Sequence, residues 1–235
     1  MKTYLPAILS LIGLLSACQK EEMLEVCSDK CTTITGRLIT GSNRTPIAGA
    51  DITVNWNYQA GIGYKSTVKT RSKTDSNGKY TVSFFIKNNE LAEGYFDVTY
   101  SVNENQYYTI GENTVAFYRN DIKRDTLIEV ADYLIPRKAY IKFAITNQSQ
   151  LITEKGQFFS DFNNCYGFNT RFNQQILGGG PVIFWNSLPS QNPLPIAGDQ
   201  SILIKNHKTR NGVLTVTTDS LFIPAGTTSN FTVTY

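Results

Sequence analysis

Thr74-Asp75-Ser76-Asn77-Gly78-Lys79-Tyr80 is the stretch that decides the fold of the first half of the chain. It joins a Thr-rich run, residues 64–73, to a run that alternates between apolar and polar residues from Tyr80 onward. Asn-Gly between two strand-like runs is typical of a two-residue β-hairpin turn, whose central positions need positive φ. The stretch therefore predicts a tight hairpin, with Tyr80 as the first buried residue of the second strand.

A strictly alternating run lies upstream of this turn, at residues 50–58. Its apolar face carries Ile52, Val54, Trp56 and Tyr58. Alternation with a period of two is typical of a strand with one buried face. A segment with Gly and Pro, residues 41–49, separates this run from an earlier strand-like run at residues 33–39. The first half is therefore predicted to be β-sheet.

Three segments of this half resemble the carboxypeptidase regulatory-like domains, small transthyretin-like β-sandwiches related to the collagen-adhesin B-type repeats. They are Gly36-x-Leu38, then Pro46-Ile47-Ala48-Gly49-Ala50-Asp51-Ile52-Thr53-Val54, and the turn from Thr74 to Tyr80. The resemblance covers residues 32 to 132. It implies a structural or interaction module rather than a catalytic one.

The first half is predicted to end near Ile135. Further strands are predicted at residues 95–102, 106–110, 115–118 and 126–131. Pro136-Arg137-Lys138 then places a proline and two positive charges between two strand-like runs, which is typical of a domain junction.

The second half is predicted to be an antiparallel sandwich of immunoglobulin-like type. Residues 139–145 alternate cleanly, and Asn211-Gly212 predicts a hairpin between two strands. Residues 158–172, rich in Asn and Phe, are predicted to be irregular. A long loop is predicted around Pro189, Pro193 and Pro195.

Leu15-Ser16-Ala17-Cys18 follows a short apolar run and resembles the lipobox of bacterial lipoproteins. Residues 5–15 are too short to span a bilayer as a permanent helix. The resemblance implies that residues 1–17 are removed and that Cys18 carries acyl chains such as palmitate, with the lipid bilayer as its partner. An ordinary secretory signal, or a buried apolar segment that ends in cysteine, is the alternative.

The residues after Cys18 are polar and mostly acidic. Gln19, Lys20, Glu21 and Glu22 resemble the surface-export tag of lipoproteins from Bacteroidota-type bacteria. This resemblance implies a protein that is lipid-anchored in the outer membrane and faces the cell exterior. Each acyl chain contributes about 0.8 kcal/mol of membrane-binding free energy per buried methylene, so two or more chains anchor a protein stably in the bilayer.

The chain as a whole is predicted to be all-β, because Thr, Asn, Gly and Tyr are abundant and 12% of its residues are aromatic. We expect two tandem antiparallel β-sandwich domains of immunoglobulin- or transthyretin-like type. The predicted parts are a lipoprotein signal peptide (residues 1–17), a lipidated tether (18–31), a carboxypeptidase regulatory-like sandwich (32–135) and a second sandwich (136–235).

Three cysteines remain after Cys18. Cys27 and Cys31 lie close together in the polar tether and are predicted to form a disulfide in an oxidising compartment. A metal site is the alternative, but the pair has no third or fourth Cys or His nearby to complete a zinc shell. Cys165 is then either buried and inert, or the partner of one of the other two.

Catalytic and cofactor chemistry finds little support in the sequence. The 22 Lys and Arg residues nearly balance the 19 Asp and Glu residues, which argues against a nucleic-acid partner. The single histidine, His207, lies in a polar stretch beside a predicted turn. The Asp75 turn resembles the start of a calcium loop but lacks its later ligands. We predict no enzyme activity, no cofactor and no bound metal.

Two functions therefore remain. The first is a non-enzymatic outer-membrane surface lipoprotein that acts as a structural or interaction module with an extracellular partner. The alternative is an extracellular glycan-binding accessory protein of a nutrient-uptake system, with aromatic side chains that stack on sugar rings. The candidate stacking residues are Trp56, Phe168 and Trp185.

Two short segments, Asp125-Thr126-Leu127 and Asp219-Ser220-Leu221, resemble the acceptor for O-glycosylation in exported proteins of Bacteroidota-type bacteria. The resemblance makes Thr126 and Ser220 candidate glycosylation sites.

The lipobox leads to a direct test of the anchor. Cells grown with labelled palmitate should incorporate the label into the wild-type protein and not into Cys18→Ala, because the thiol is the acceptor of the lipid. Cys165→Ala is the matched control and should keep the label. Label retained in Cys18→Ala would contradict the assignment.

Overall fold

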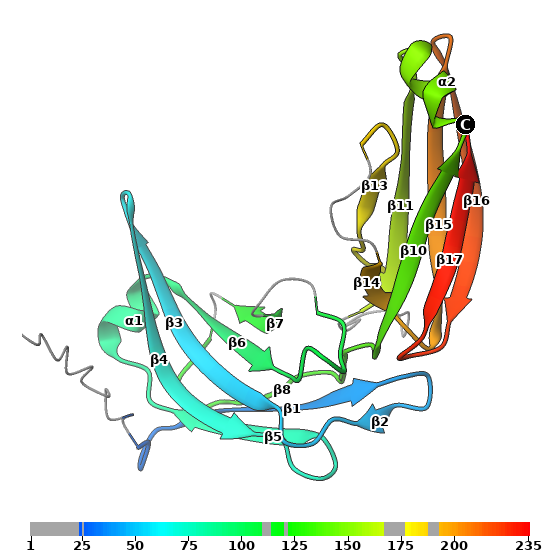
Figure 1. Cartoon of the computed structure of the whole chain (residues 1–235). Coiled ribbons are helices and arrows are strands. Elements are labelled where there is room, and N and C mark those ends of the chain that lie inside the picture. The colour runs from blue at the N-terminus through cyan, green and yellow to red at the C-terminus, as the bar shows by residue number, and fades with distance from the viewer. Residues whose placement is uncertain (1–23, 25, 110–113, 120–121, 167–176, 188–192) are drawn as a thin grey trace, which may run out of the picture.

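The computed structural model describes residues 24, 26–109, 114–119, 122–166, 177–187 and 193–235. Figure 1 shows that the regular secondary structure of the described chain is β-strand apart from two short helices. The prediction of an all-β protein with β-sandwich architecture is confirmed. The lipobox and the tag at residues 19–22 lie outside the described residues.

One sheet of the first half is organised around β1, its longest strand. β2 and β5 pair with β1 in antiparallel fashion, whereas β8 and β9 pair with it in parallel. These strands are β1 (Thr32–Thr40), β2 (Thr45–Pro46), β5 (Lys79–Phe84), β8 (Leu127–Glu129) and β9 (Tyr133–Leu134). The parallel pairs have no signature in the local sequence, because they join segments far apart in the chain.

The facing sheet has the strand order β4-β3-β6-β7. Its strands are β3 (Asp51–Ala60), β4 (Gly63–Lys73), β6 (Tyr95–Ser101) and β7 (Thr114–Arg119), and helix α1 (Asn88–Ala92) precedes β6. The predicted alternation of β3 is confirmed, since Ile52 and Val54 are fully buried and Trp56 is 5% exposed. These side chains pack against Ile34, Leu38 and Phe84 of the β1 sheet to form the first core.

The second half also consists of two sheets around a core of its own. One sheet has the order β14-β10-β17, and the other has the order β12-β11-β15-β16 with β13 also paired to β11. The elements are β10 (Lys138–Thr146), α2 (Gln148–Thr153), β11 (Gln157–Cys165), β12 (Leu177–Gly178), β13 (Val182–Phe184), β14 (Leu194–Ala197), β15 (Gln200–Arg210), β16 (Val213–Ile223) and β17 (Thr228–Thr234). The Asn211-Gly212 hairpin is confirmed, because it joins β15 to β16.

The hairpin predicted at Asn77-Gly78 is wrong. β4 pairs with β3 and β5 pairs with β1, so this turn carries the chain from one sheet to the other. Asp75 organises it, because Asp75 Oδ1 accepts the N–H groups of Asn77 and Lys79, both at 2.8 Å. Within the turn only Gly78 has a positive φ, +72°.

Three further expectations are corrected. Residues 157–165 form β11 instead of an irregular segment, and Pro195 lies within β14 instead of in a loop. The strand predicted at residues 106–110 is reduced, over its described part, to a single bridge between Tyr107 and Arg137. Proline is compatible with β14 because this strand pairs on one side only, with β10.

A buried ion pair ties α1 to the sheet beneath it. Lys69 is the extra residue of β4 at the register shift in the β3–β4 ladder. Its side chain is buried, with Nζ 2.7 Å and 2.8 Å from the two carboxylate oxygens of Glu90. Glu90 Oε2 also accepts the N–H of Lys87 at 2.8 Å, which caps the helix. A buried charge of this kind is tolerated because it is paired and hydrogen-bonded.

Gly78 offers a test of the turn with an internal control. A Cβ at Gly78 would lie 2.4 Å from the carbonyl oxygen of Leu38, whereas a Cβ at Gly49, with nearly the same φ of +73°, would meet nothing within 4 Å. Gly49→Ala should cost about 1 kcal/mol for the left-handed backbone. Gly78→Ala should cost about 1–3 kcal/mol more, as overpacking does. Equal losses in urea denaturation would contradict the steric argument.

Candidate functional site

The cysteines are arranged in one of the ways left open by the sequence. Cys27 and Cys31 form a disulfide directly before β1, and Cys165 at the end of β11 carries a free thiol. Burial raises the pKa of the Cys165 thiol, which disfavours the reactive thiolate. Cys165 is partly exposed, so it is less buried than an inert core cysteine.

Both tryptophans proposed as sugar-stacking residues are buried, and this corrects that expectation. Trp56 is 5% exposed and its Nε1 donates to the carbonyl of Glu93, while Trp185 is fully buried and donates to Ser160 Oγ. Neither indole offers a face to a ligand in solution, because each ring fills a core. Phe168 lies outside the described residues.

The two candidate glycosylation sites differ in accessibility. Thr126 is partly buried, and its hydroxyl donates to the carbonyl of Arg124 at 2.9 Å. Ser220 is exposed on β16, where its N–H donates to Asp219 Oδ1 at 2.7 Å. Ser220 is therefore the more accessible of the two hydroxyls.

Four tyrosines join the two halves. Tyr100 and Tyr133 belong to the first half, and Tyr166, which follows β11, packs edge-on against Tyr133 and is hydrogen-bonded to Tyr100 through their hydroxyls. Tyr108 is 8% exposed beside them, and its N–H donates to the carbonyl of Pro136. Burial raises the pKa of Tyr133 and raises the pKa of Tyr108 to about 12. This tyrosine cluster forms a desolvated contact between the halves.

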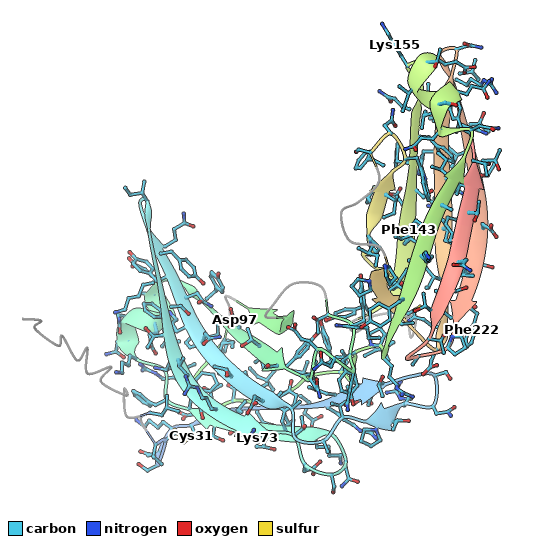
Figure 2. All side chains as sticks on the ribbon, in the orientation of Figure 1. Cys31, Lys73, Asp97, Phe143, Lys155 and Phe222 are labelled. Carbon is cyan, nitrogen blue, oxygen red and sulfur yellow. A yellow bond between two sulfur atoms is a disulfide. The ribbon has the colours of Figure 1, made fainter. Side chains whose placement is uncertain are left out.

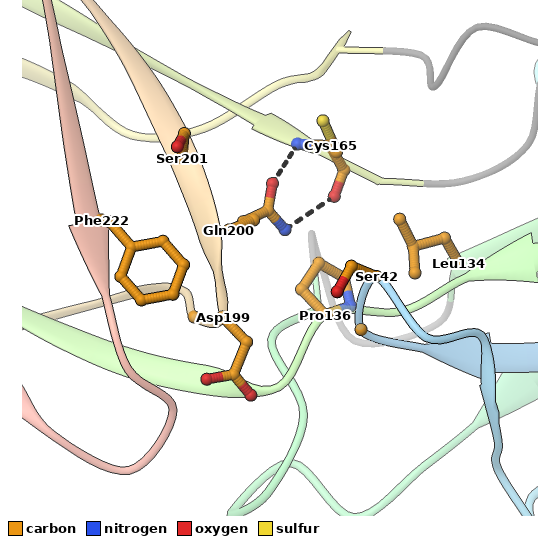
Figure 3. Close-up of a pocket in the computed structure, with 10 residues that line it drawn as sticks. Ser42, Leu134, Pro136, Cys165, Asp199, Gln200, Ser201 and Phe222 are labelled. Atoms are coloured by element: carbon orange, nitrogen blue, oxygen red, sulfur yellow. Dashed lines mark hydrogen bonds between the residues drawn. The ribbon is translucent and has the colours of Figure 1, made fainter.

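A pocket of about 380 Å³ is lined by residues of both halves (Figure 3). Its lining includes Leu134, Pro136, Cys165, Asp199, Gln200 and Phe222. The Gln200 amide bonds both the N–H and the carbonyl of Cys165, as Figure 3 shows. Asp199 is also engaged, because Oδ1 accepts the N–H of Ala225 and Oδ2 lies 3.6 Å from Arg137. The pocket therefore suits a small neutral group better than an ionic one.

The most exposed apolar surface lies on the outer side of the sheet that contains β16. Five of the twelve large apolar side chains exposed among the described residues lie on this side of two strands: Val182 and Phe184 on β13, and Leu214, Val216 and Phe222 on β16. Phe159 of β11 lies between Phe184 and His207, and its ring stacks on the imidazole with centroids 4.5 Å apart. We call this surface the apolar face.

His207 is part of the apolar face, where it contacts Phe159 and Asp161. Its Nε2 lies 3.1 Å from Asp161 Oδ2, within ion-pair distance but without hydrogen-bond geometry. Within the described residues, no group of three or more His, Cys, Asp or Glu side chains is placed to hold a metal. Among the same residues, no helix has the length and apolarity needed to cross a membrane.

Comparison with known proteins identifies no family, since no family model and no curated protein matches the chain. Among solved structures, a 9R-lipoxygenase from Cyanothece matches 49% of the chain with 13% identity and a TM-score of 0.33. The Bacillus anthracis TIE protein matches 87% with 11% identity and a TM-score of 0.33, and a streptococcal ancillary pilin matches 88% with 12% identity and a TM-score of 0.31. The matched regions cover 18%, 34% and 63% of those chains.

The buried tyrosines predict a loss of stability at alkaline pH. Burial raises the pKa of Tyr80 and of Tyr108 to about 12. Their contribution is complete below pH 10 and is lost as pH rises towards 12, because the unfolded chain releases these protons first. The free energy of unfolding should fall by up to about 1.4 kcal/mol per pH unit for each tyrosine.

Urea denaturation between pH 9 and 11.5 measures this slope. Tyr108→Phe should reduce it, because this change removes one of the phenols whose pKa burial raises. An unchanged slope in Tyr108→Phe would contradict the assignment.

Proposed function

We propose that this protein is a non-enzymatic surface lipoprotein that acts as an interaction module for an extracellular protein. Acylated Cys18 anchors it in the outer membrane, and the chain faces the cell exterior. The resemblance of residues 15–18 to a lipobox and of residues 19–22 to an export tag supports this cellular location. The two-sandwich architecture supports the role of a module.

The observation that carries the proposal is the apolar face. Phe184 is 57% exposed, and with Phe159 and Val182 it forms a contiguous apolar row on one sheet. Large contiguous apolar patches on soluble proteins mark sites of protein contact, since water solvates them poorly. Aromatic residues are also enriched in the buried centres of protein interfaces.

The position of the apolar face relative to the anchor fits display to a partner. Cys31 lies at one end of the first half, and Phe222 and the rest of the second half lie beyond its other end (Figure 2). The lipid-bearing tether would therefore hold the first half near the membrane. The second half would project the apolar face away from the bilayer.

A protein partner is favoured over a glycan. The two tryptophans predicted to stack on sugar rings, Trp56 and Trp185, are buried and present no face to a glycan. The exposed ring of Phe184 shares its side of the sheet with aliphatic side chains such as Val182 and Val216, an arrangement that suits the apolar surface of a protein.

A binding array can test this function. The chain without residues 1–18 would be applied to printed extracellular proteins and polysaccharides. Binding to at least one protein is expected, and Phe184→Ser should weaken it by about tenfold or more, as loss of an interface anchor does. Ile62→Ser is the matched control, because Ile62 is fully exposed in the first half. Binding to polysaccharides alone would contradict the proposal.

A further inference from the structure

β16 is a long edge strand with nothing paired to its outer side among the described residues. Its eleven residues, Val213–Ile223, pair with β15 at every position without a register shift. All of them except Leu221 and Ile223 are exposed. An unbroken edge of this length presents a row of unpaired backbone groups to any strand that approaches.

The other long edge strand, β4, has features that hinder pairing with a strand of another molecule. β4 also has eleven residues and also lies at the edge of its sheet, but it carries four basic residues, Lys65, Lys69, Arg71 and Lys73, and a register shift. β16 has one charged residue, Asp219, no proline and no bulge. Proteins that must stay monomeric guard long edges with charge, proline or bulges, so the contrast marks β16 as an edge left open for pairing.

The outward backbone groups of β16 can be assigned from one contact. The N–H of Ser220 donates to the side chain of Asp219 at 2.7 Å, so we place this N–H on the outer edge of the strand, away from β15. In an antiparallel strand alternate residues face alternate neighbours. The outward set therefore consists of Leu214, Val216, Thr218, Ser220 and Phe222.

We propose that β16 pairs with β16 of a second copy of this chain, antiparallel and about a two-fold axis at Thr218. This register uses the whole strand, because it places Leu214 opposite Phe222 and Val216 opposite Ser220 of the partner. The outward set of one strand then meets the outward set of the other. The two sheets become one continuous sheet across the axis.

The side chains suit this self-pairing. In the centred register the outward residues all lie on the outer side of the sheet, so Leu214 of one copy covers the exposed ring of Phe222 of the other. The single charge, Asp219, lies opposite Thr217 and not opposite its own copy. A charged strand from another protein has no basic or acidic partner along β16, apart from Asp219, which favours a second copy as the occupant.

The pairing goes beyond the proposed function, because it involves the edge of β16 and leaves Phe184 and Phe159 free on the sheet surface. Two copies held on one membrane by their tethers would meet at a high effective concentration. A strand interface that is weak in solution would then be populated at the cell surface.

The oligomeric state tests the proposal. The chain without residues 1–18, produced in the cytosol so that Ser220 stays unmodified, should sediment as a monomer–dimer mixture at about 0.5 mM, where even a millimolar complex is populated. Thr218→Lys places two like charges across the axis and should weaken association about tenfold or more. Ser66→Lys adds the same charge to the edge strand β4 and should leave association unchanged.

Disulfide trapping tests the register. Thr217 and Asp219 of the partner form a pair without mutual hydrogen bonds, where the Cα atoms lie about 4.5 Å apart and a disulfide fits. In a background without other cysteines (Cys27→Ser, Cys31→Ser and Cys165→Ser), Thr217→Cys mixed with Asp219→Cys should give a cross-linked dimer under mild oxidation. Neither variant should cross-link alone.

Three results would overturn the proposal: a monomer at 0.5 mM with no cross-link on mixing, association that Thr218→Lys leaves unchanged, or efficient cross-linking of Thr217→Cys by itself. If no printed protein binds on the array but the mixed cysteine variants cross-link, the proposed function is rejected and the self-pairing of β16 stands.

Discussion

The contact of Tyr166 with Tyr100 and Tyr133 is the interaction on which the arrangement of this molecule depends. Tyr166 comes from the second half, yet it is 5% exposed and belongs to the core of the first half. A buried phenol costs free energy unless its hydroxyl is bonded, and the hydroxyls of Tyr166 and Tyr100 satisfy each other. The second half is thereby held on one end of the first, with β16 and the apolar face left exposed.

This contact bears on the boundary near Ile135. Ile135 is fully buried in the first core, and Ala197 of β14 packs into the same core. The two cores are otherwise separate, each enclosed by its own pair of sheets. The two halves can melt independently only if the tyrosine cluster contributes less to stability than either core does alone.

The sequence predicts the local elements better than their partners. Alternation identified β3 and β10, because one buried face imposes a period of two. The prediction of a hairpin at Asn77-Gly78 is wrong because the sequence of a turn reports only its local conformation. The choice of β1 as the partner of β5 is set by tertiary packing. β11 was missed because Ser160 and Asn164 are polar, and only the structure reveals that both are fully buried and that Ser160 Oγ accepts from Trp185.

The candidate site could be predicted from the sequence only in part. Burial of Trp56 follows from its alternating run, but burial of Trp185 depends on Phe143, Phe158 and Phe231, which converge on it from three strands. The open edge had a readable signal in the charge content of two equal strands, since β4 carries four basic residues and β16 carries one acid. The difference in charge becomes informative only once both strands are known to lie at sheet edges. A strand in the middle of a sheet is already paired on both sides, so it needs no charged residues to prevent further pairing.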